Sequence, residues 1–208
     1  MGSCSPHPPG LWGMPPEMLN KLPGYDPDVQ KNRAEARQIM HTLGYSLDNH
    51  LKIKVTVRDI PYYRDPAVIL IDQLKQVYVD GELEPVDTTN FFPKMMRKDY
   101  SVGLNLQGAA DPDQTFPQLY GCSPEFNRNN YRNPEVEELI RWQSSEADQE
   151  KRKQLVWQIE RKLAEDDARP IIFYSRDGTC RQPHVKGLTL MVNSIFNGWR
   201  MEDVWLDK

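Results

Sequence analysis

The order of strands and helices between residues 51 and 106 is the feature that most constrains the fold. Residues 51–58 alternate apolar and polar side chains, which is typical of a β-strand with one polar face. The pattern then predicts a helix capped by Asp65, a strand over residues 82–88, a helix over residues 90–98 and a strand over residues 100–106. Strands separated by single helices require crossover connections. The sequence therefore predicts an α/β fold with a mostly parallel sheet flanked by helices.

Three further helices carry recognisable start or stop signals. A helix over residues 27–43 is expected to have Asp26 as its N-cap and Gly44 as its C-terminal stop. Asn133 is a good N-cap and Pro134 suits the first helical position, while Asp148 is expected to cap the next helix. The two later helices each have one apolar face, formed by Val136, Leu139, Ile140 and Gln143 in the first, and by Arg152, Leu155, Val156, Ile159 and Leu163 in the second.

The remaining positions of this region have simple expected environments. Lys151, Glu160 and their charged neighbours are expected to face water, and Trp142 and Trp157 to be packing residues. Pro170 ends the helical region, and the apolar residues 171–174 suit a short buried strand.

Composition narrows the function classes. The chain has 208 residues, of which 38% are hydrophobic and 27% charged, so one compact α/β lobe with a real core is expected. No apolar run approaches the ~20 residues that a membrane span needs, so the chain is not expected to be membrane-inserted. The net charge of −4 argues against a nucleic-acid partner, which requires a basic surface.

The order of several motifs resembles one protein family. From Tyr131 the sequence reads Tyr-x-Asn-Pro-x-Val-Glu-x-Leu-Ile, from Asp148 it reads Asp-x-x-Lys-Arg, and from Arg169 it reads Arg-Pro-Ile-Ile. This order resembles the carboxy-terminal half of extracellular solute-binding proteins of ABC importers, in the peptide/nickel group that includes the dipeptide and oligopeptide binders. Three more segments are similar to the family's motifs: residues 24–45, Asp111-Pro112-Asp113, and Val185-Lys186-Gly187-Leu188.

The resemblance implies a fold and a role. The fold would be one lobe of the type II periplasmic-binding-protein kind over residues 23–208, with short C-terminal strands that return toward an absent first lobe. Residues 1–22 would be an irregular, proline-rich start outside that lobe, and the family's signal peptide and first half would be missing. The chain would contribute one wall of the solute cleft in a periplasmic protein. Its partners would be a small solute (a peptide, or an opine-like compound or oligosaccharide) and a membrane permease.

A different class of function remains open beside this one, namely a free-standing soluble interaction module without a transport role. The chain has no G-x-S-x-G, phosphate-binding glycine loop or H-E-x-x-H sequence, so no enzyme activity is expected. No cofactor is expected either. His184 follows Cys180 by four residues without a second pair of ligands, which does not support a metal site.

The loop after the strand at residues 100–106 is the best candidate for ligand contact, because ligands of open α/β sheets lie beyond the carboxyl ends of the strands. Its candidate residues are Asn105, Gln107, Gly108 and Asp111. The alternative for Asp111 and Asp113 is that they shape a turn and cap the next helix. Peptide-binding members of the family carry an aromatic residue and an aspartate here, and the aspartate pairs with the peptide's amino terminus. The corresponding residues of this chain are Asn105 and Gly108, so an uncharged or differently charged solute is comparably well suited.

Two other groups of residues are candidates. Trp199 and Arg200 form a turn near the chain end that could contact solute, as could other aromatic residues such as Phe92 and Tyr120; packing is the alternative for all of them. Cys122 and Cys180 could form a disulfide in an oxidising periplasm, or could remain free thiols.

Overall fold

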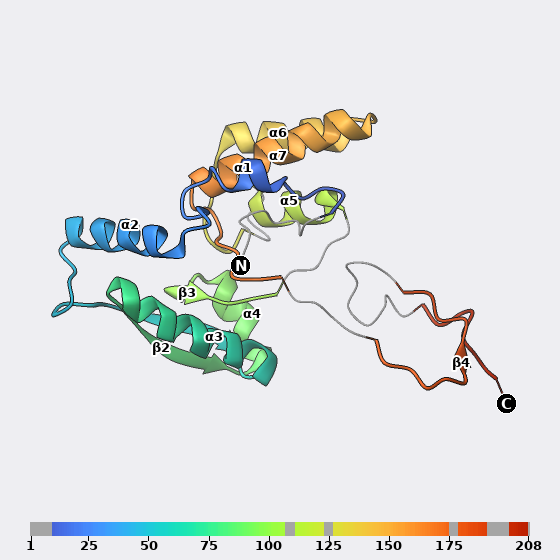
Figure 1. The fold of residues 1–208 in the computed structure, drawn as a ribbon, viewed down its shortest axis with the longest axis horizontal. Coiled ribbons are helices and arrows are strands. Elements are labelled where there is room, and N and C mark those ends of the chain that lie inside the picture. Colours follow the sequence, from blue (N-terminus) through green and yellow to red (C-terminus); the bar gives the residue numbers. More distant parts are fainter. Residues whose placement is uncertain (1–9, 107–110, 123–126, 175–178, 191–199, 208) are drawn as a thin grey trace.

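The computed structural model describes residues 10–106, 111–122, 127–174, 179–190 and 200–207, and it has a sheet part, a helical part and a C-terminal arm (Figure 1). In chain order the elements are α1 (Pro16–Leu19), α2 (Val29–Thr42), β1 (Leu51–Arg58), α3 (Pro61–Leu74), the 3-10 helix η1 (Lys75–Val77), β2 (Val79–Val86), α4 (Thr88–Met96), β3 (Val102–Gly103), α5 (Pro112–Tyr120), α6 (Pro134–Ser145), α7 (Gln149–Glu165), β4 (Val185–Lys186) and β5 (Trp205–Leu206).

The sheet part contains a three-stranded parallel sheet in the order β2-β1-β3. The predicted α/β fold with a parallel sheet and crossover helices is confirmed. β1 pairs with β2 along its whole length, from Leu51 opposite Val79 to Arg58 opposite Val86, so β2 begins earlier than the predicted residue 82. β3 is only two residues long, which makes the prediction of a strand over residues 100–106 wrong in extent. Only two residue pairs join β3 to β1, because the chain turns away after Leu104 donates its backbone N–H to Thr56 at 2.9 Å.

Helices cover both faces of this sheet. Val55 and Val57 of β1 are fully buried against Tyr63 and Ala67 of α3. Thr56 points to the opposite face, since side chains alternate along a strand. There its hydroxyl donates to Glu84 Oε2 at 2.5 Å. α4 lies on that second face, where Lys94 forms an ion pair with the same carboxylate at 3.4 Å.

Two predicted N-caps are corrected by the structure. α3 begins at Pro61, so Asp65 lies inside the helix rather than before it; a proline at the first helical position loses no hydrogen bond and can start a helix without a capping side chain. α2 is capped by Asp28, whose carboxylate accepts the N–H groups of Gln30 and Lys31, and not by Asp26. The predicted stop at Gly44 is confirmed by its φ of +89° just beyond the helix.

The helical part is formed by α5, α6 and α7, which pack around one apolar cluster. The predicted caps are confirmed: Asn133 accepts the N–H of Glu135 at 3.0 Å, and Asp148 accepts those of Glu150 and Lys151 at 3.0 Å each. Most residues of the predicted inner faces are buried, with Val136, Val156 and Ile159 at 0% exposure, whereas Arg152 and Leu155 are partly buried.

α7 is buried over a wider arc than its sequence pattern indicates. Glu160, expected to face water, is fully buried, and that prediction is wrong. The reason is that α6 covers one side of α7 while residues 10–22 cover another. Met14 and Leu22 pack with Ala164, and the indole of Trp157 donates to the carbonyl oxygen of Trp12 at 3.0 Å.

Residues 10–22 were expected to be irregular, yet they contain α1 and contribute to the core. Trp12, Met14 and Leu22 are each less than 10% exposed. Pro16 occupies the first position of α1, where its missing N–H costs nothing. Proline is therefore compatible with this one-turn helix.

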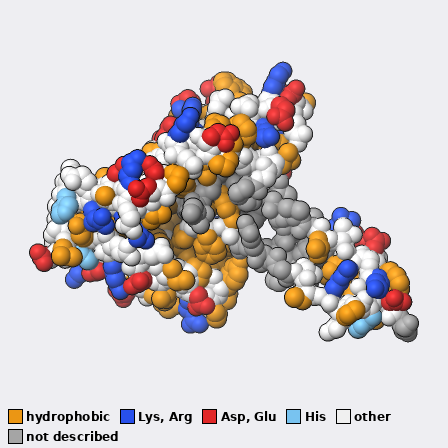
Figure 2. Space-filling view, in the orientation of Figure 1, with side chains coloured by type: hydrophobic (Ala, Val, Ile, Leu, Met, Phe, Trp, Pro, Cys, Tyr) orange, Lys and Arg blue, Asp and Glu red, His pale blue; other side chains and the backbone are white. Residues whose placement is uncertain are grey.

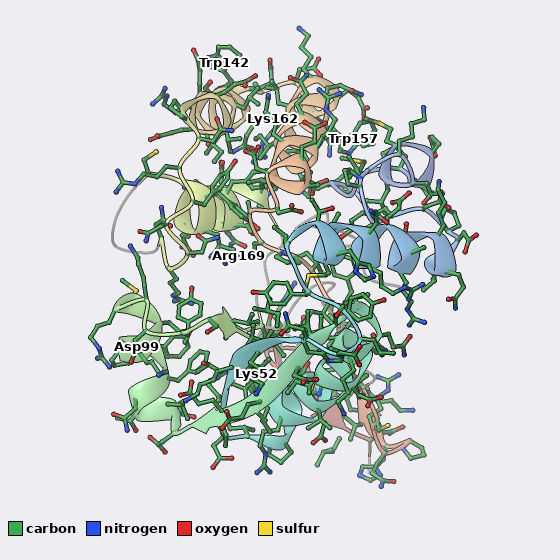
Figure 3. The ribbon with its side chains drawn as sticks, turned by 90° about the vertical axis from the view of Figure 1, so that its left-hand side faces the viewer. Lys52, Asp99, Trp142, Trp157, Lys162 and Arg169 are labelled. Atoms are coloured by element: carbon green, nitrogen blue, oxygen red, sulfur yellow. The ribbon has the colours of Figure 1, made fainter. Side chains whose placement is uncertain are left out.

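Two expectations about apolar side chains are wrong. Trp142 is 52% exposed and lies on the outer side of the helical part (Figure 3), whereas Trp157 is a packing residue as predicted. Residues 171–174 form no strand, and Phe173 is 47% exposed. A strand requires a neighbouring edge for its backbone groups, and none of the described residues pairs with this segment.

The described ends of the C-terminal arm, residues 179–190 and 200–207, lie apart from the rest of the molecule (Figure 1). Val185 pairs with Leu206 and Lys186 with Trp205 in an antiparallel ladder. Gly187 follows with a φ of +73°, in the left-handed region that favours glycine.

Candidate functional site

The carboxyl ends of the parallel strands form the candidate edge for ligand contact. Arg58 is the last residue of β1, Asp87 follows β2, and Asn105 follows β3 by two residues. Asn105 is exposed here, as expected of a ligand-contacting residue. Gln107 and Gly108 lie outside the described residues. Asp87 caps α4 by accepting the N–H of Thr89 at 2.8 Å, and these backbone hydrogen bonds lower the pKa of its carboxyl group.

Asp111 has two structural roles. It is the N-cap of α5 and accepts the backbone N–H of Asp113 at 2.9 Å. It also receives a two-pronged contact from Arg152 of α7, with Nη2 2.6 Å from Oδ1 and Nη1 3.1 Å from Oδ2. Asp111 therefore caps α5, as the structural alternative to ligand contact predicted, and it also forms an ion pair with Arg152.

We call the contacts around this pair the Arg152 network. Arg152 Nε donates to Gln143 Oε1 at 3.1 Å, and the Gln143 amide donates to Asp113 Oδ1 at 2.5 Å. The guanidinium also lies over the ring of Trp12 at 4.7 Å from its centroid. The hydrogen bond to Asp111 raises the pKa of Arg152, so this group is always charged. The network ties the end of the candidate loop to α6 and α7, and so it holds one side of the edge in place.

The sequence pattern placed Arg152 on the inner face of its helix but did not identify its partners. Its separation from Asp111 is 41 residues, and no local pattern links the two positions. The available signal is the long charged side chain within an apolar stripe, which requires a buried partner.

A second group at the same edge was not predicted as a functional site. We call it the arginine cluster: Arg58 and Arg128 placed around the ring of Phe92. Their guanidinium carbons lie 5.6 and 5.1 Å from the centroid of that ring, and Arg58 also lies 4.0 Å from the ring centroid of Tyr63. Such cation–π contacts contribute about 0.5–2 kcal/mol each, depending on how dry they are.

The arginines of this cluster are incompletely satisfied. The Nε atoms of Arg58 and Arg128 are buried and have no hydrogen-bond partner among the described residues. Burial lowers the pKa of Arg128, and the positive charge of Arg169 lowers it further. Arg169 lies where the helical part faces the sheet part (Figure 3), with its guanidinium 5.3 Å from the ring centroid of Tyr120. Tyr100 fixes the backbone beside the cluster by donating its hydroxyl to the Arg128 carbonyl at 2.9 Å.

The second predicted group lies elsewhere. Arg200 belongs to the C-terminal arm, away from the strand ends (Figure 1), and its guanidinium pairs with Glu202 at 2.9 Å. Trp199 lies outside the described residues. The structure thus does not bring Arg200 together with Asn105 and Asp111.

The cysteine pair is not bonded in the structure. Cys122 follows α5 and Cys180 belongs to the C-terminal arm, and both are free thiols. The disulfide considered for them is therefore absent, because the arm extends away from the helical part that holds Cys122 (Figure 1). Hydrogen bonding to Glu137, and then burial, raises the pKa of the Cys122 thiol, so it is held protonated and is a poor nucleophile.

The described residues were searched for membrane-spanning helices and for clusters of metal-binding side chains. Within the described ranges, no helix is long and apolar enough to cross a membrane, and no group of histidine, cysteine or carboxylate side chains is arranged to hold a metal ion. Acidic and basic side chains are interspersed over the helical part in the face shown in Figure 2.

Comparison with known proteins identifies the fold. No family model and no curated protein matches the sequence. Solved structures do match, and they include substrate-binding proteins of the peptide- and oligopeptide-binding type. The chain has the fold of that class, as its resemblance predicted.

Three structures illustrate the match. The oligopeptide-binding protein AppA from Bacillus subtilis, in complex with a nonapeptide, has a TM-score of 0.77 and 18% identity, covering 100% of this chain and 43% of that one. Haemophilus influenzae OppA, in complex with the peptide RPPGFSPFR, has a TM-score of 0.73 and 17% identity, covering 91% of this chain and 39% of that one. DppA from Helicobacter pylori, in complex with the peptide STSA, has a TM-score of 0.68 and 18% identity, covering 88% of this chain and 35% of that one. The chain thus spans about two fifths of the length of these structures.

Proposed function

We propose that this chain is part of the substrate-binding component of an ABC import system and that it contributes one wall of a solute cleft. The observation that carries the proposal is the structural match, with a TM-score of 0.77 over the whole chain, to a protein solved with a bound peptide. The proposed wall is the edge where the strands end, with Asn105 facing the solute. Ligands of open α/β sheets lie at this edge.

The chain covers less than half of each matched structure, so we propose that a further lobe supplies the opposite wall. In this proposal the lobe consists of residues 23–208 together with residues 10–22, which pack on α7. The working place is the periplasm and the macromolecular partner is a membrane permease. Two lobes that close on a hinge around a solute would present the closed form to that partner. The function is binding without turnover.

The solute is proposed to be a peptide or another small polar compound such as an opine or oligosaccharide. Position 108 is glycine, where the peptide-binding pattern has an aspartate. A buried ammonium without a carboxylate is strongly disfavoured. We therefore expect no preference for solutes with a free amino terminus.

The test is a titration of the isotope-labelled 208-residue chain followed by NMR. The solute panel contains short peptides, the same peptides acetylated at the amino terminus, an opine, an oligosaccharide and nickel. At least one solute should shift the amide signals of residues 58–60 and 104–106, weakly, because one wall removes little of a solute's surface from water. The acetylated and free peptides should bind alike. If no member of the panel affects these signals, or if the shifts gather on the outer side of α6 and α7, the proposed cleft wall is wrong.

A further inference from the structure

The arginine cluster contains two positive charges that form no ion pair within the described part of the chain. Among the described residues, no carboxylate lies within ion-pair distance of Arg58 or Arg128, and neither guanidinium donates a hydrogen bond. Arginines that only stabilise a fold are normally paired when they are partly buried, because an unpaired charge is costly to remove from water.

The nearby carboxylates are already engaged by other groups. Asp59, the residue after Arg58, pairs with Arg64 at 3.1 Å. Asp87, at the end of the neighbouring strand, caps α4. The charge that most affects Arg128 is another positive one, that of Arg169. Neither of these two carboxylates is therefore paired with the arginine cluster.

The position of the cluster also fits a ligand site. Arg58 ends the central strand of the parallel sheet, at the edge where ligands bind. Arg58 and Arg128 are half-buried, and Phe92 remains 36% exposed, so all three can be reached from solvent. The ring of Phe92 contacts both guanidinium groups, at 5.6 Å for Arg58 and 5.1 Å for Arg128, and so limits the conformations of the two side chains.

We propose that Arg58 and Arg128, placed around Phe92, bind an oxyanion group of the solute, either a carboxylate or a phosphate. The planar guanidinium fork matches both groups and donates paired hydrogen bonds to them. The guanidinium groups would be the donors, and the exposed part of Phe92 would contact the body of an organic anion. This inference rests on the proposed function, since it assigns the charge of the solute at the same edge.

An oxyanion site here also accounts for the departure at Gly108. The peptide-binding pattern supplies a negative charge for an ammonium group, and this chain lacks that charge. The arginine cluster supplies positive charge instead. The preferred solute is therefore acidic rather than basic at the end that meets the strand ends.

The experiment titrates the labelled 208-residue chain with sodium phosphate and, separately, with sodium succinate, using sodium chloride of equal ionic strength as the reference. The arginine Nε–H signals of Arg58 and Arg128 are followed by NMR. We expect phosphate, succinate or both to shift these two signals in a saturable way, with no such shift in chloride. A response to phosphate alone or succinate alone identifies the preferred oxyanion. No response to either, or an equal response to chloride, overturns the proposal.

Variants locate the effect. Arg58→Met and Arg128→Met each remove one charge while retaining an apolar stem, and each should weaken binding of the responding anion by about tenfold, which corresponds to one charge-assisted pair. The matched control is Arg161→Met, which removes the same charge from an exposed position on α7, where the side chain is 52% exposed. It should change the affinity less than about twofold. Equal weakening by all three variants would show only a general charge effect and would overturn the site.

The two titrations separate the anion site from the proposed function. If the solute panel shifts the strand-end amides but neither anion shifts the arginine signals, the anion site is wrong and the cleft wall stands. If the anions shift the arginine signals but no panel solute affects the edge, the anion site stands and the transport role fails.

Discussion

Replacing Arg152 by methionine removes the guanidinium that joins α7 to the start of α5. The side chain of Arg152 is only 16% exposed and makes two hydrogen bonds to Asp111, at 2.6 and 3.1 Å. A third hydrogen bond reaches Gln143, which is fully buried. The substitution retains an apolar stem at this position, so its effect reports mainly on the lost charge and hydrogen bonds.

The expected loss of stability follows from the burial of each partner. Breaking a buried ion pair from one side costs about 3–5 kcal/mol, and an exposed pair contributes about 0–1 kcal/mol. The Asp111 side chain is 40% exposed, so water can solvate it again, but Gln143 Oε1 loses a buried donor at a cost of about 1–3 kcal/mol. Between these limits we expect a loss of about 2 kcal/mol. For a chain of this size that lowers Tm by about 4–8 °C.

The assay is urea and thermal unfolding of the 208-residue chain followed by circular dichroism. Arg152→Lys retains the charge but not the fork, and should lose about half as much stability as Arg152→Met. The control is Arg161→Met on the same helix, whose ion pair with Glu165 is long, at 3.8 Å, and exposed. It should cost less than about 0.5 kcal/mol. If Arg152→Met and Arg161→Met destabilise equally, the Arg152 network contributes nothing specific and the reasoning fails.

Three further outcomes test other parts of the structure. Phe116→Ala should cost about 3–5 kcal/mol in urea unfolding, since Phe116 is fully buried, while Trp142→Ala, at a 52% exposed position, should cost under about 0.5 kcal/mol; similar losses would contradict the helical core. Gly187→Ala should increase amide hydrogen exchange in the C-terminal arm only, because the glycine has a φ of +73° and an added Cβ would meet a backbone oxygen at 1.9 Å; unchanged exchange would be contrary evidence. Tyr131→Phe removes a 2.7 Å hydrogen bond that, as the largest cause, lowers the pKa of Asp166. A lowered pKa of Asp166 stabilises the folded chain fully only at pH values above the pKa of about 4 that aspartate has in the unfolded chain. The variant should therefore be less stable than the original chain at neutral pH, and the difference should vanish as the pH falls through the pKa of Asp166 in the folded chain. A difference that does not depend on pH would refute this.

The helices were predictable because their signals are local. Asn133 and Asp148 cap α6 and α7 as expected, since an N-cap bonds to N–H groups two or three residues ahead. The missed cap at Asp28 has the same origin. Asp26 and Asp28 are both suitable residues two positions apart, and only the path of the chain selects between them.

The strands were less predictable, because pairing requires a second segment. β1 matched its predicted bounds, since it is central and hydrogen-bonds on both sides. Residues 171–174 have a similar apolar composition but form no strand, as no described neighbour offers an edge. The burial of Glu160 was missed for a related reason, namely that the start segment covers a side of α7 that periodicity assigns to water.

The sequence by itself determined the alternation of strands and helices, the caps of α6 and α7 and the resemblance to solute-binding proteins, because each depends on residues close together in the chain. Only the tertiary structure decided which side chains meet at the strand ends. Asp111 meets Arg152 across 41 residues, and Arg58 and Arg128 share the ring of Phe92. Such meetings depend on how the crossover helices and the helical part pack on the sheet, and side-chain charge then acts through space rather than along the chain.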